Sequence, residues 1–195
     1  MDRQCGYVFG YGSLVDIDQL ARFVGREIKS HEWTICRLRG YRRLWNIAMD
    51  NIVDLPGYKY YIDAKTRVRP RIFVTFLNIQ PCENRAINGI AFRISAEELH
   101  MLDIRERNYD RIGVDGMLDR ELPAPCWVYV GTDEAERRYQ EGLRNNNACI
   151  DRNYYEAVET AFATHGSAFL AEFHGSTDGV PVPMRDLRVV PLPSK

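Results

Sequence analysis

A chain of 195 residues with 26 basic and 27 acidic side chains has a formal net charge of −1, and 45% of its residues are hydrophobic. This composition is typical of one folded domain, here spanning 1–195, and it excludes a disordered or fibrous protein. The balanced charge argues against a nucleic-acid-binding protein, because phosphate contacts usually need an excess of cations. No apolar run reaches the roughly 20 residues of a membrane span, and the first residues lack a signal-peptide core. We therefore expect a cytoplasmic protein that binds neither nucleic acid nor membrane.

The cysteines are odd in number and widely spaced, which suits a reducing compartment where disulfides are rare. They are Cys5, Cys36, Cys82, Cys126 and Cys149. No two lie at C-x-x-C spacing, and the four histidines form no H-x-x-x-H pattern. A structural zinc site is therefore not expected.

The first third of the chain predicts a strand, a helix and two more strands. Residues 6–14 predict a short buried strand that runs into a glycine-containing loop, and Asp16 or Ser13 can cap the helix that follows and ends at Gly25. Residues 32–48 alternate apolar and polar side chains, which predicts two strands broken near Gly40.

The prolines and glycine of residues 50–70 predict an excursion loop. Residues 71–79 and 87–94 predict a pair of strands joined through Pro81. Ser95 and Glu98 form a capping box that starts a short helix. Four more elements are expected, namely strands at 109–114 and 125–130 and helices at 134–143 and 153–165.

Strands dominate the first two thirds of the chain and helices the last third, an order that predicts an α+β fold. We expect a mixed small β-barrel or curved sheet with flanking helices. The four prolines near 175–195 predict an irregular tail.

Two segments carry residue types that could bind a ligand or take part in catalysis. Where a buried strand turns into a helix, as at Tyr11, Gly12, Ser13 and Leu14, free backbone N–H groups can bind a carboxylate or phosphate, although an ordinary tight turn has the same pattern. Glu106 follows the capped helix and lies between two arginines, where a solvated ion pair is the common outcome. Asp103 is an equally available carboxylate, so the residues alone do not choose between them.

Two other patterns have simpler explanations. The arginine-rich runs at 37–43 and 67–71 could face RNA, but without an excess of positive charge they indicate the solvated side of a strand. A Cys-His nucleophile is conceivable, yet no cysteine is linked to a histidine by spacing, and buried cysteines are mostly inert.

Two motifs, VFGYGSL at 8–14 and LDIRERNY at 102–109, together resemble the gamma-glutamylcyclotransferase family, including its ChaC-type branch. Weaker similarities support the match in the same order, at GYRRLWN (40–46), INGIAF (87–92) and CWVYV (126–130). The resemblance covers about residues 6–130, and a weaker similarity in the helical segment continues to about residue 165.

The resemblance implies a mixed α/β barrel-like fold and an enzyme that converts a γ-glutamyl amine, amide or peptide to 5-oxoproline with release of the amine. In that family pattern Glu106 is the proton shuttle, and the amides of Tyr11, Gly12, Ser13 and Leu14 hold the α-carboxylate or the developing oxyanion. Tyr109 and Tyr129 are implied pocket residues, and neither metal nor organic cofactor is implied.

We expect burial beside Ile104 and Tyr109 to raise the pKa of Glu106, and Arg105 and Arg107 to lower it.

The chain departs from the family pattern at Arg107, where many members have glycine, and it lacks the G-x-x-G-x-N-x-E-Y run of ChaC-type proteins. Strict glutathione specificity is therefore not implied. Two alternatives stay open: a non-catalytic protein that binds small molecules on the same fold, and an RNA-associated protein that uses the arginine runs.

Overall fold

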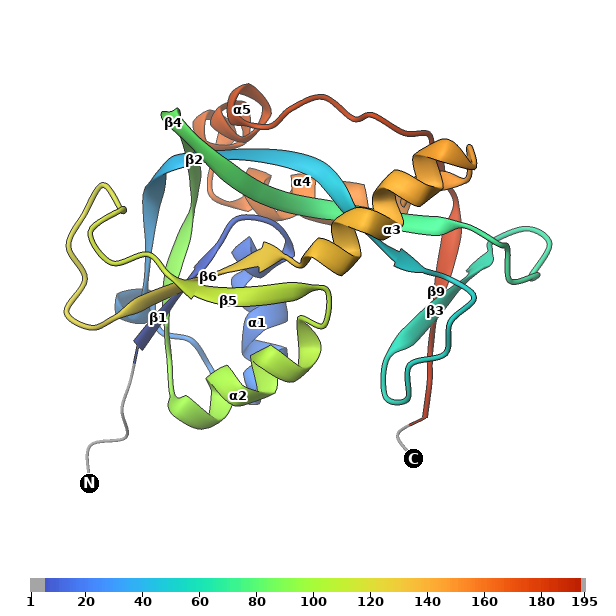
Figure 1. Ribbon diagram of the computed structural model, residues 1–195. Helices are drawn as coiled ribbons and strands as arrows, with labels where there is room; N and C mark the ends of the chain where they lie inside the picture. The colour runs from blue at the N-terminus through green and yellow to red at the C-terminus, as the bar shows by residue number, and fades with distance from the viewer. Residues whose placement is uncertain (1–5, 194–195) are drawn as a thin grey trace.

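Two long antiparallel strands, β2 (Trp33–Asp50) and β4 (Phe73–Ile94), organise the computed structural model, which describes residues 6–193 (Figure 1). The sequence predicted two strands in each region, and this prediction is corrected to one. The β2–β4 register shifts between Arg39 and Tyr41, where Gly40 has a φ of +79°. An irregularity of this kind bends the strand without ending it, so β2 continues past the point where a break was predicted. Pro81 lies beside it, opposite Tyr41.

A seven-stranded mixed sheet extends from this pair in the order β5-β6-β1-β4-β7-β8, with β2 also on β4. Its other strands are β1 (Gly6–Gly10), β5 (Tyr109–Gly113), β6 (Cys126–Gly131), β7 (Ala148–Asp151) and β8 (Met184–Arg185). The α+β prediction is confirmed with an open sheet, because within the described residues β5 and β8 end the order and do not pair with each other. The barrel alternative is therefore wrong.

Five helices flank the sheet in the described part of the chain: α1 (Ile17–Val24), α2 (Ala96–Arg105), α3 (Asp133–Arg144), α4 (Arg152–Thr164) and α5 (Ser167–Ser176). The predicted caps are confirmed, since Asp16 accepts a hydrogen bond from the Gln19 amide and Ser95 forms the capping box with Glu98. Helix α5 and the short strands β7 and β8 were not predicted from the sequence. None of these helices combines the length and apolarity that a membrane crossing needs.

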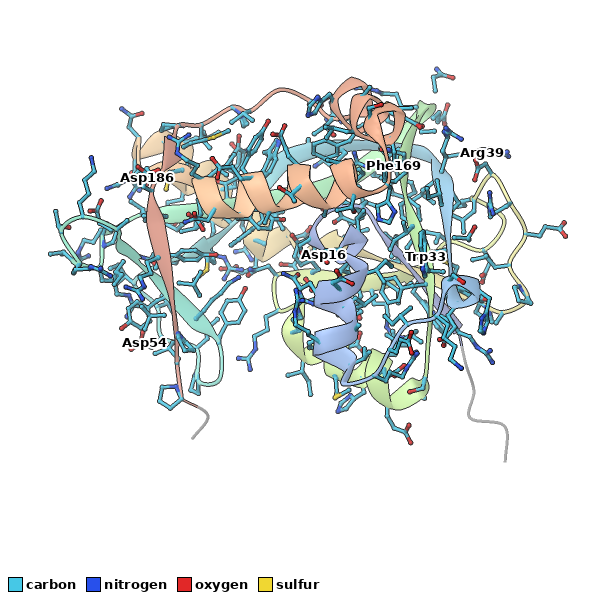
Figure 2. All side chains as sticks on the ribbon, turned by 180° about the vertical axis from the view of Figure 1, so that it is seen from behind. Asp16, Trp33, Arg39, Asp54, Phe169 and Asp186 are labelled. Carbon is cyan, nitrogen blue, oxygen red and sulfur yellow. The ribbon has the colours of Figure 1, made fainter. Side chains whose placement is uncertain are left out.

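The excursion at 50–70 and the tail near 175–195 meet in a two-stranded antiparallel ribbon (Figures 1 and 2). Strand β3 (Lys59–Asp63) pairs with β9 (Leu187–Pro191), so the expected loop and irregular tail each contain a strand. Residues 187–190 contain no proline and keep the N–H groups that a ladder needs. Tyr61 and Leu187 bury the inner side of the ribbon in a small core with the ends of β2 and β4. Cys5 and the last two tail residues lie outside the described residues.

The fully buried Asn51 anchors this ribbon. Its side-chain amide donates hydrogen bonds to the carbonyls of Tyr61 (2.9 Å) and Pro70 (3.0 Å), and its Oδ1 accepts one from the Tyr61 amide (2.7 Å). Asn51→Ala leaves these three backbone groups unpaired, so we expect it to lower the free energy of unfolding by about 2 kcal/mol. Hydrogen exchange should show the loss first at the Tyr61 amide; unchanged protection there would contradict this role.

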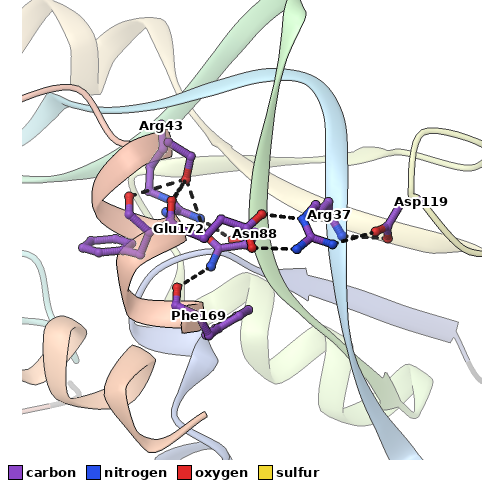
Figure 3. A network of polar contacts seen from close by, with 8 residues as sticks. Arg37, Arg43, Asn88, Asp119, Phe169 and Glu172 are labelled. Carbon is purple, nitrogen blue, oxygen red and sulfur yellow. Dashed lines mark hydrogen bonds and ion pairs between the residues drawn. The ribbon is translucent and has the colours of Figure 1, made fainter. Parts of the chain in front are cut away.

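Arg43 on β2 is fully buried, which corrects the expectation that its arginine run is solvated. Its Cζ atom lies 5.0 Å from the ring centroid of Phe162 and 4.8 Å from that of Phe173. The guanidinium also donates to the backbone and side-chain oxygens of Asn88, whose amide donates to the Phe169 carbonyl (Figure 3). Burial lowers the pKa of Arg43 to about 9. The network ties α4 and α5 to the long strands.

Two neighbouring arginines of the run, Arg37 and Arg42, are more exposed and carry ion pairs. Arg37 pairs with Glu172 of α5 and with Asp119, as Figure 3 shows, and Arg42 pairs with Asp178 at 3.5 Å. These carboxylates offset much of the positive charge of the run. These contacts give Arg37, Arg42 and Arg43 a structural role in holding α5 and the segment after it against the long strands.

Candidate active site

A chamber lies between the ribbon, the C-terminal end of α2 and the loop that follows β1. Its outer part is a cavity of about 410 Å³, and a narrow inner pocket of about 30 Å³ adjoins it. Both parts are lined by Ser13, Glu106, Tyr109 and Tyr154.

All seven site residues proposed from the sequence line the inner pocket. They are Tyr11, Gly12, Ser13, Leu14, Glu106, Tyr109 and Tyr129. The structure thus brings the 11–14 loop and Glu106 together across one pocket, although they are about 90 residues apart in sequence.

The 11–14 loop presents the start of a short 3-10 helix, Ser13–Val15, to the pocket. The first hydrogen bond of this turn runs from the Val15 amide to the Gly12 carbonyl, at 3.0 Å. The amides of Ser13 and Leu14 precede that bond and have no acceptor within the turn. Backbone donors at such a position suit an anionic group.

Glu106 caps the C-terminal end of α2. Its amide donates to the Leu102 carbonyl at 2.9 Å, and its own carbonyl accepts from the Tyr109 amide at 3.0 Å. This turn leaves the side chain 16% exposed and facing both parts of the chamber.

Burial raises the pKa of Glu106 above its usual value, and two cations oppose the rise. The larger opposing effect comes from Arg105, whose Nε lies 3.4 Å from Glu106 Oε1, and the smaller one from Lys59. Arg107 does not contribute as expected: its side chain lies over the ring of Tyr58 and donates to the Ile104 carbonyl. Ile104 is itself 53% exposed.

The structure decides between the two candidate carboxylates. Asp103 lines neither part of the chamber. Its Oδ1 accepts a hydrogen bond from the Tyr129 hydroxyl at 2.7 Å and pairs with Arg111 at 3.1 Å. Of these two carboxylates, Glu106 is the one that faces the chamber.

Hydrogen bonds to protein acceptors hold three tyrosines in the pocket wall. The hydroxyl of Tyr11 donates to the Tyr129 carbonyl and that of Tyr109 to the Leu77 carbonyl, both at 2.7 Å. Tyr129 donates to Asp103, so these three hydroxyl protons are already engaged. These tyrosines shape the pocket, and burial raises the pKa of each, so they are neutral near pH 7.

Sequence reasoning missed several residues of the chamber. These are Phe23, Tyr58, Lys59, Phe76, Asn108 and Tyr154. Tyr58 and Lys59 lie in the excursion predicted as a loop, where the cluster of tyrosines at 58–61 is the available signal. The Asn108 amide donates to the Tyr58 hydroxyl at 3.2 Å, which connects the ribbon to the segment that carries Glu106.

The cysteines do not form a second candidate centre. No described cysteine lines either part of the chamber. Burial raises the pKa of the Cys36 and Cys126 thiols to about 12 and that of Cys149 to about 11, which disfavours thiolates. Over residues 6–193, no group of three histidine, cysteine or acidic side chains is arranged to hold a metal ion.

Comparison with solved structures gives the same fold at low sequence identity. A gamma-glutamyl cyclotransferase matches with a TM-score of 0.51 and 10% identity over 91% of each chain. An uncharacterized protein from Homo sapiens matches with a TM-score of 0.53 and 11% identity over 90% of each chain. YkqA from Bacillus subtilis matches with a TM-score of 0.58 and 15% identity, over 91% of this chain and 56% of that one.

No protein-family model and no curated protein matches the sequence. The structural matches show that the chain has a gamma-glutamyl cyclotransferase-like fold, as the motifs suggested.

Proposed function

We propose that the chain is an enzyme that cyclises a γ-glutamyl group to 5-oxoproline and releases the attached amine. The observation that carries this proposal is the shared pocket of Glu106 and the 11–14 loop. A carboxylate with a raised pKa and the backbone donors at the start of the Ser13–Val15 turn are the two groups that this reaction needs. The gamma-glutamyl cyclotransferase among the structural matches supports the same reaction class.

The reaction is an intramolecular aminolysis. The substrate's α-amino nitrogen forms a bond to its own γ-carbonyl carbon, and the bond from that carbon to the leaving nitrogen breaks. Holding the γ-glutamyl chain folded back makes this attack effectively unimolecular, which is a large rate advantage. The inner pocket, walled by Tyr11, Tyr109 and Tyr129, adjoins the larger outer cavity, and the two parts together give room for a chain held in that conformation.

Glu106 moves the protons. An α-ammonium carries three protons, the lactam product keeps one, and the other two end on the leaving nitrogen. Glu106 as carboxylate takes a proton from the α-nitrogen and as carboxylic acid gives it to the leaving nitrogen. A pKa raised by burial favours this exchange, because it makes the carboxylate a better acceptor for the proton of the α-ammonium.

The backbone amides of the 11–14 loop bind an anionic part of the substrate, either its α-carboxylate or the oxyanion that forms at the γ-carbon. Donors fixed by the fold need little reorganisation as charge develops, which makes them effective in a buried pocket.

The experiment that tests this function is an assay of 5-oxoproline released from glutathione, γ-glutamyl amino acids and γ-glutamylamines. Release from at least one donor class supports the proposal. Saturable binding of these donors without 5-oxoproline would favour the non-catalytic alternative.

The pH profile gives a further test. Activity needs ionised Glu106, so kcat/KM falls as the pH drops through the pKa of this carboxyl. Arg105→Gln removes the larger of the two influences that lower this pKa. We therefore expect the acidic limb of the profile to move to higher pH in this variant. A limb that stays in place or moves to lower pH would contradict the assignment.

A further inference from the structure

The ribbon contributes a cation to the outer chamber. Lys59, the first residue of β3, lines this cavity together with Tyr58, and its ladder partner is Pro191. The Leu192 amide donates to the Tyr58 carbonyl at 2.8 Å, which extends the pairing beyond the strand. Lys59 is thus held in place by the backbone of a segment about 130 residues away.

Aromatic rings surround the Lys59 ammonium. Its Nζ atom lies 5.2 to 5.7 Å from the ring centroids of Phe76, Tyr58 and Tyr61. Among residues 6–193, no carboxylate oxygen lies within ion-pair distance of it. Burial lowers the pKa of Lys59, whereas Glu106 favours its charged form. A half-buried ammonium without a close counter-ion gains from an anionic ligand.

The charges of the outer chamber favour an anion. Its described lining holds two cations, Lys59 and Arg105, against the single carboxylate of Glu106. When Glu106 takes up a proton, the lining carries two uncompensated positive charges. In the proposed reaction the 11–14 loop holds the α-carboxylate or the developing oxyanion at the inner pocket, which directs the leaving amine towards the outer cavity.

We propose that Lys59 binds a carboxylate carried by the leaving amine, which makes γ-glutamyl amino acids and γ-glutamyl peptides better substrates than γ-glutamylamines without that group. The inference rests on the proposed function and adds the class of leaving group. A cavity of about 410 Å³ is within the range that holds small ligands. In a γ-glutamyl amino acid the carboxylate is separated from the leaving nitrogen by a single carbon, so both fit one chamber.

The test compares γ-glutamylalanine with γ-glutamylalaninamide, which differ only in the terminal carboxylate. We expect the full-length protein to have the higher kcat/KM for the acid. In Lys59→Met the ratio of the two values should fall about tenfold, whereas Lys59→Arg should keep most of it. Lys65→Met is the matched control, because Lys65 is exposed on the same excursion and lines neither part of the chamber; its ratio should equal that of the wild type.

An unchanged ratio in a folded Lys59→Met protein, or a wild-type preference for the amide, would overturn the inference while leaving the proposed function intact. If the wild type releases 5-oxoproline from neither compound, the ratio of the two dissociation constants, measured by calorimetry, takes the place of the kinetic ratio. The proposed function fails only when glutathione and the γ-glutamylamines release no 5-oxoproline either. A binding preference for the acid that is lost in Lys59→Met then supports the anion site by itself. No binding, or equal binding of both compounds, would overturn it.

Discussion

Glu106→Gln is expected to reduce 5-oxoproline release by roughly 10²- to 10⁴-fold, the range for loss of a general acid–base group. The amide keeps nearly the same size and can still hydrogen-bond, but it neither accepts the proton of the α-ammonium nor donates one to the leaving nitrogen. The effect should appear in kcat, with a smaller change in KM, because the lost interaction acts in the transition state. Single-turnover measurement of 5-oxoproline tests this directly.

The same variant should not lose stability near neutral pH. The pKa of Glu106 is higher in the folded protein than in the unfolded chain, so the folded state binds this proton more tightly. The contribution of Glu106 to stability is thus present below the ordinary pKa and is lost as pH rises through the folded-state value. Above that value glutamine removes a buried charge, so the thermal midpoint should stay equal or rise.

Asp103→Asn is the matched control for Glu106→Gln, since Asp103 is on the same helix but lines neither part of the chamber. It should keep most of the activity. Full activity in Glu106→Gln, or an equal loss in Asp103→Asn, would contradict the role assigned to Glu106.

Gly89→Ala is expected to destabilise the protein by about 3 kcal/mol, the upper part of the range for overpacking. A Cβ atom on Gly89 would lie 2.2 Å from the carbonyl oxygen of Gly10 and 2.6 Å from the ring of Phe9. The first contact is with backbone of the neighbouring strand β1, which cannot rotate away. Urea unfolding should show the loss of stability.

This substitution should also reduce activity, because Gly10 directly precedes the 11–14 loop and any shift of β1 moves the backbone donors. Gly113→Ala is the control in another strand: nothing lies within 4 Å of its Cβ position, and its φ is not in the left-handed region. It should be neutral or slightly stabilising. Equal stability of the two variants would show that β1 and β4 tolerate a larger separation.

Local sequence patterns predicted much of what surrounds the site. The capping box of Ser95 and Glu98 places the start of α2, and the ten residues of that helix place its end beside Glu106. The strand-to-helix turn after β1 was predicted from its glycines and the apolar run before it. These features depend on neighbours in sequence, so their physical causes are visible in a short stretch of chain.

Long-range pairing decided the rest. The β3–β9 ribbon joins residues 59–63 to 187–191, and neither segment has a strong strand signal without the other. The position of Lys59 in the chamber was therefore hidden in the sequence. The same holds for Arg43, whose burial depends on Phe162 and Phe173 from the last two helices.

Composition and motif order by themselves determined an α+β fold and the two segments that carry the candidate chemistry. Only the tertiary structure distinguishes Glu106 from Asp103. Glu106 lines the chamber, whereas packing places Asp103 outside it, where it binds Tyr129 and Arg111. The tertiary structure also excluded the barrel and placed a cation in the outer chamber. A net charge of −1 describes the whole chain, whereas ligand binding depends on local charge, and burial and strand pairing determine which charges face the pocket.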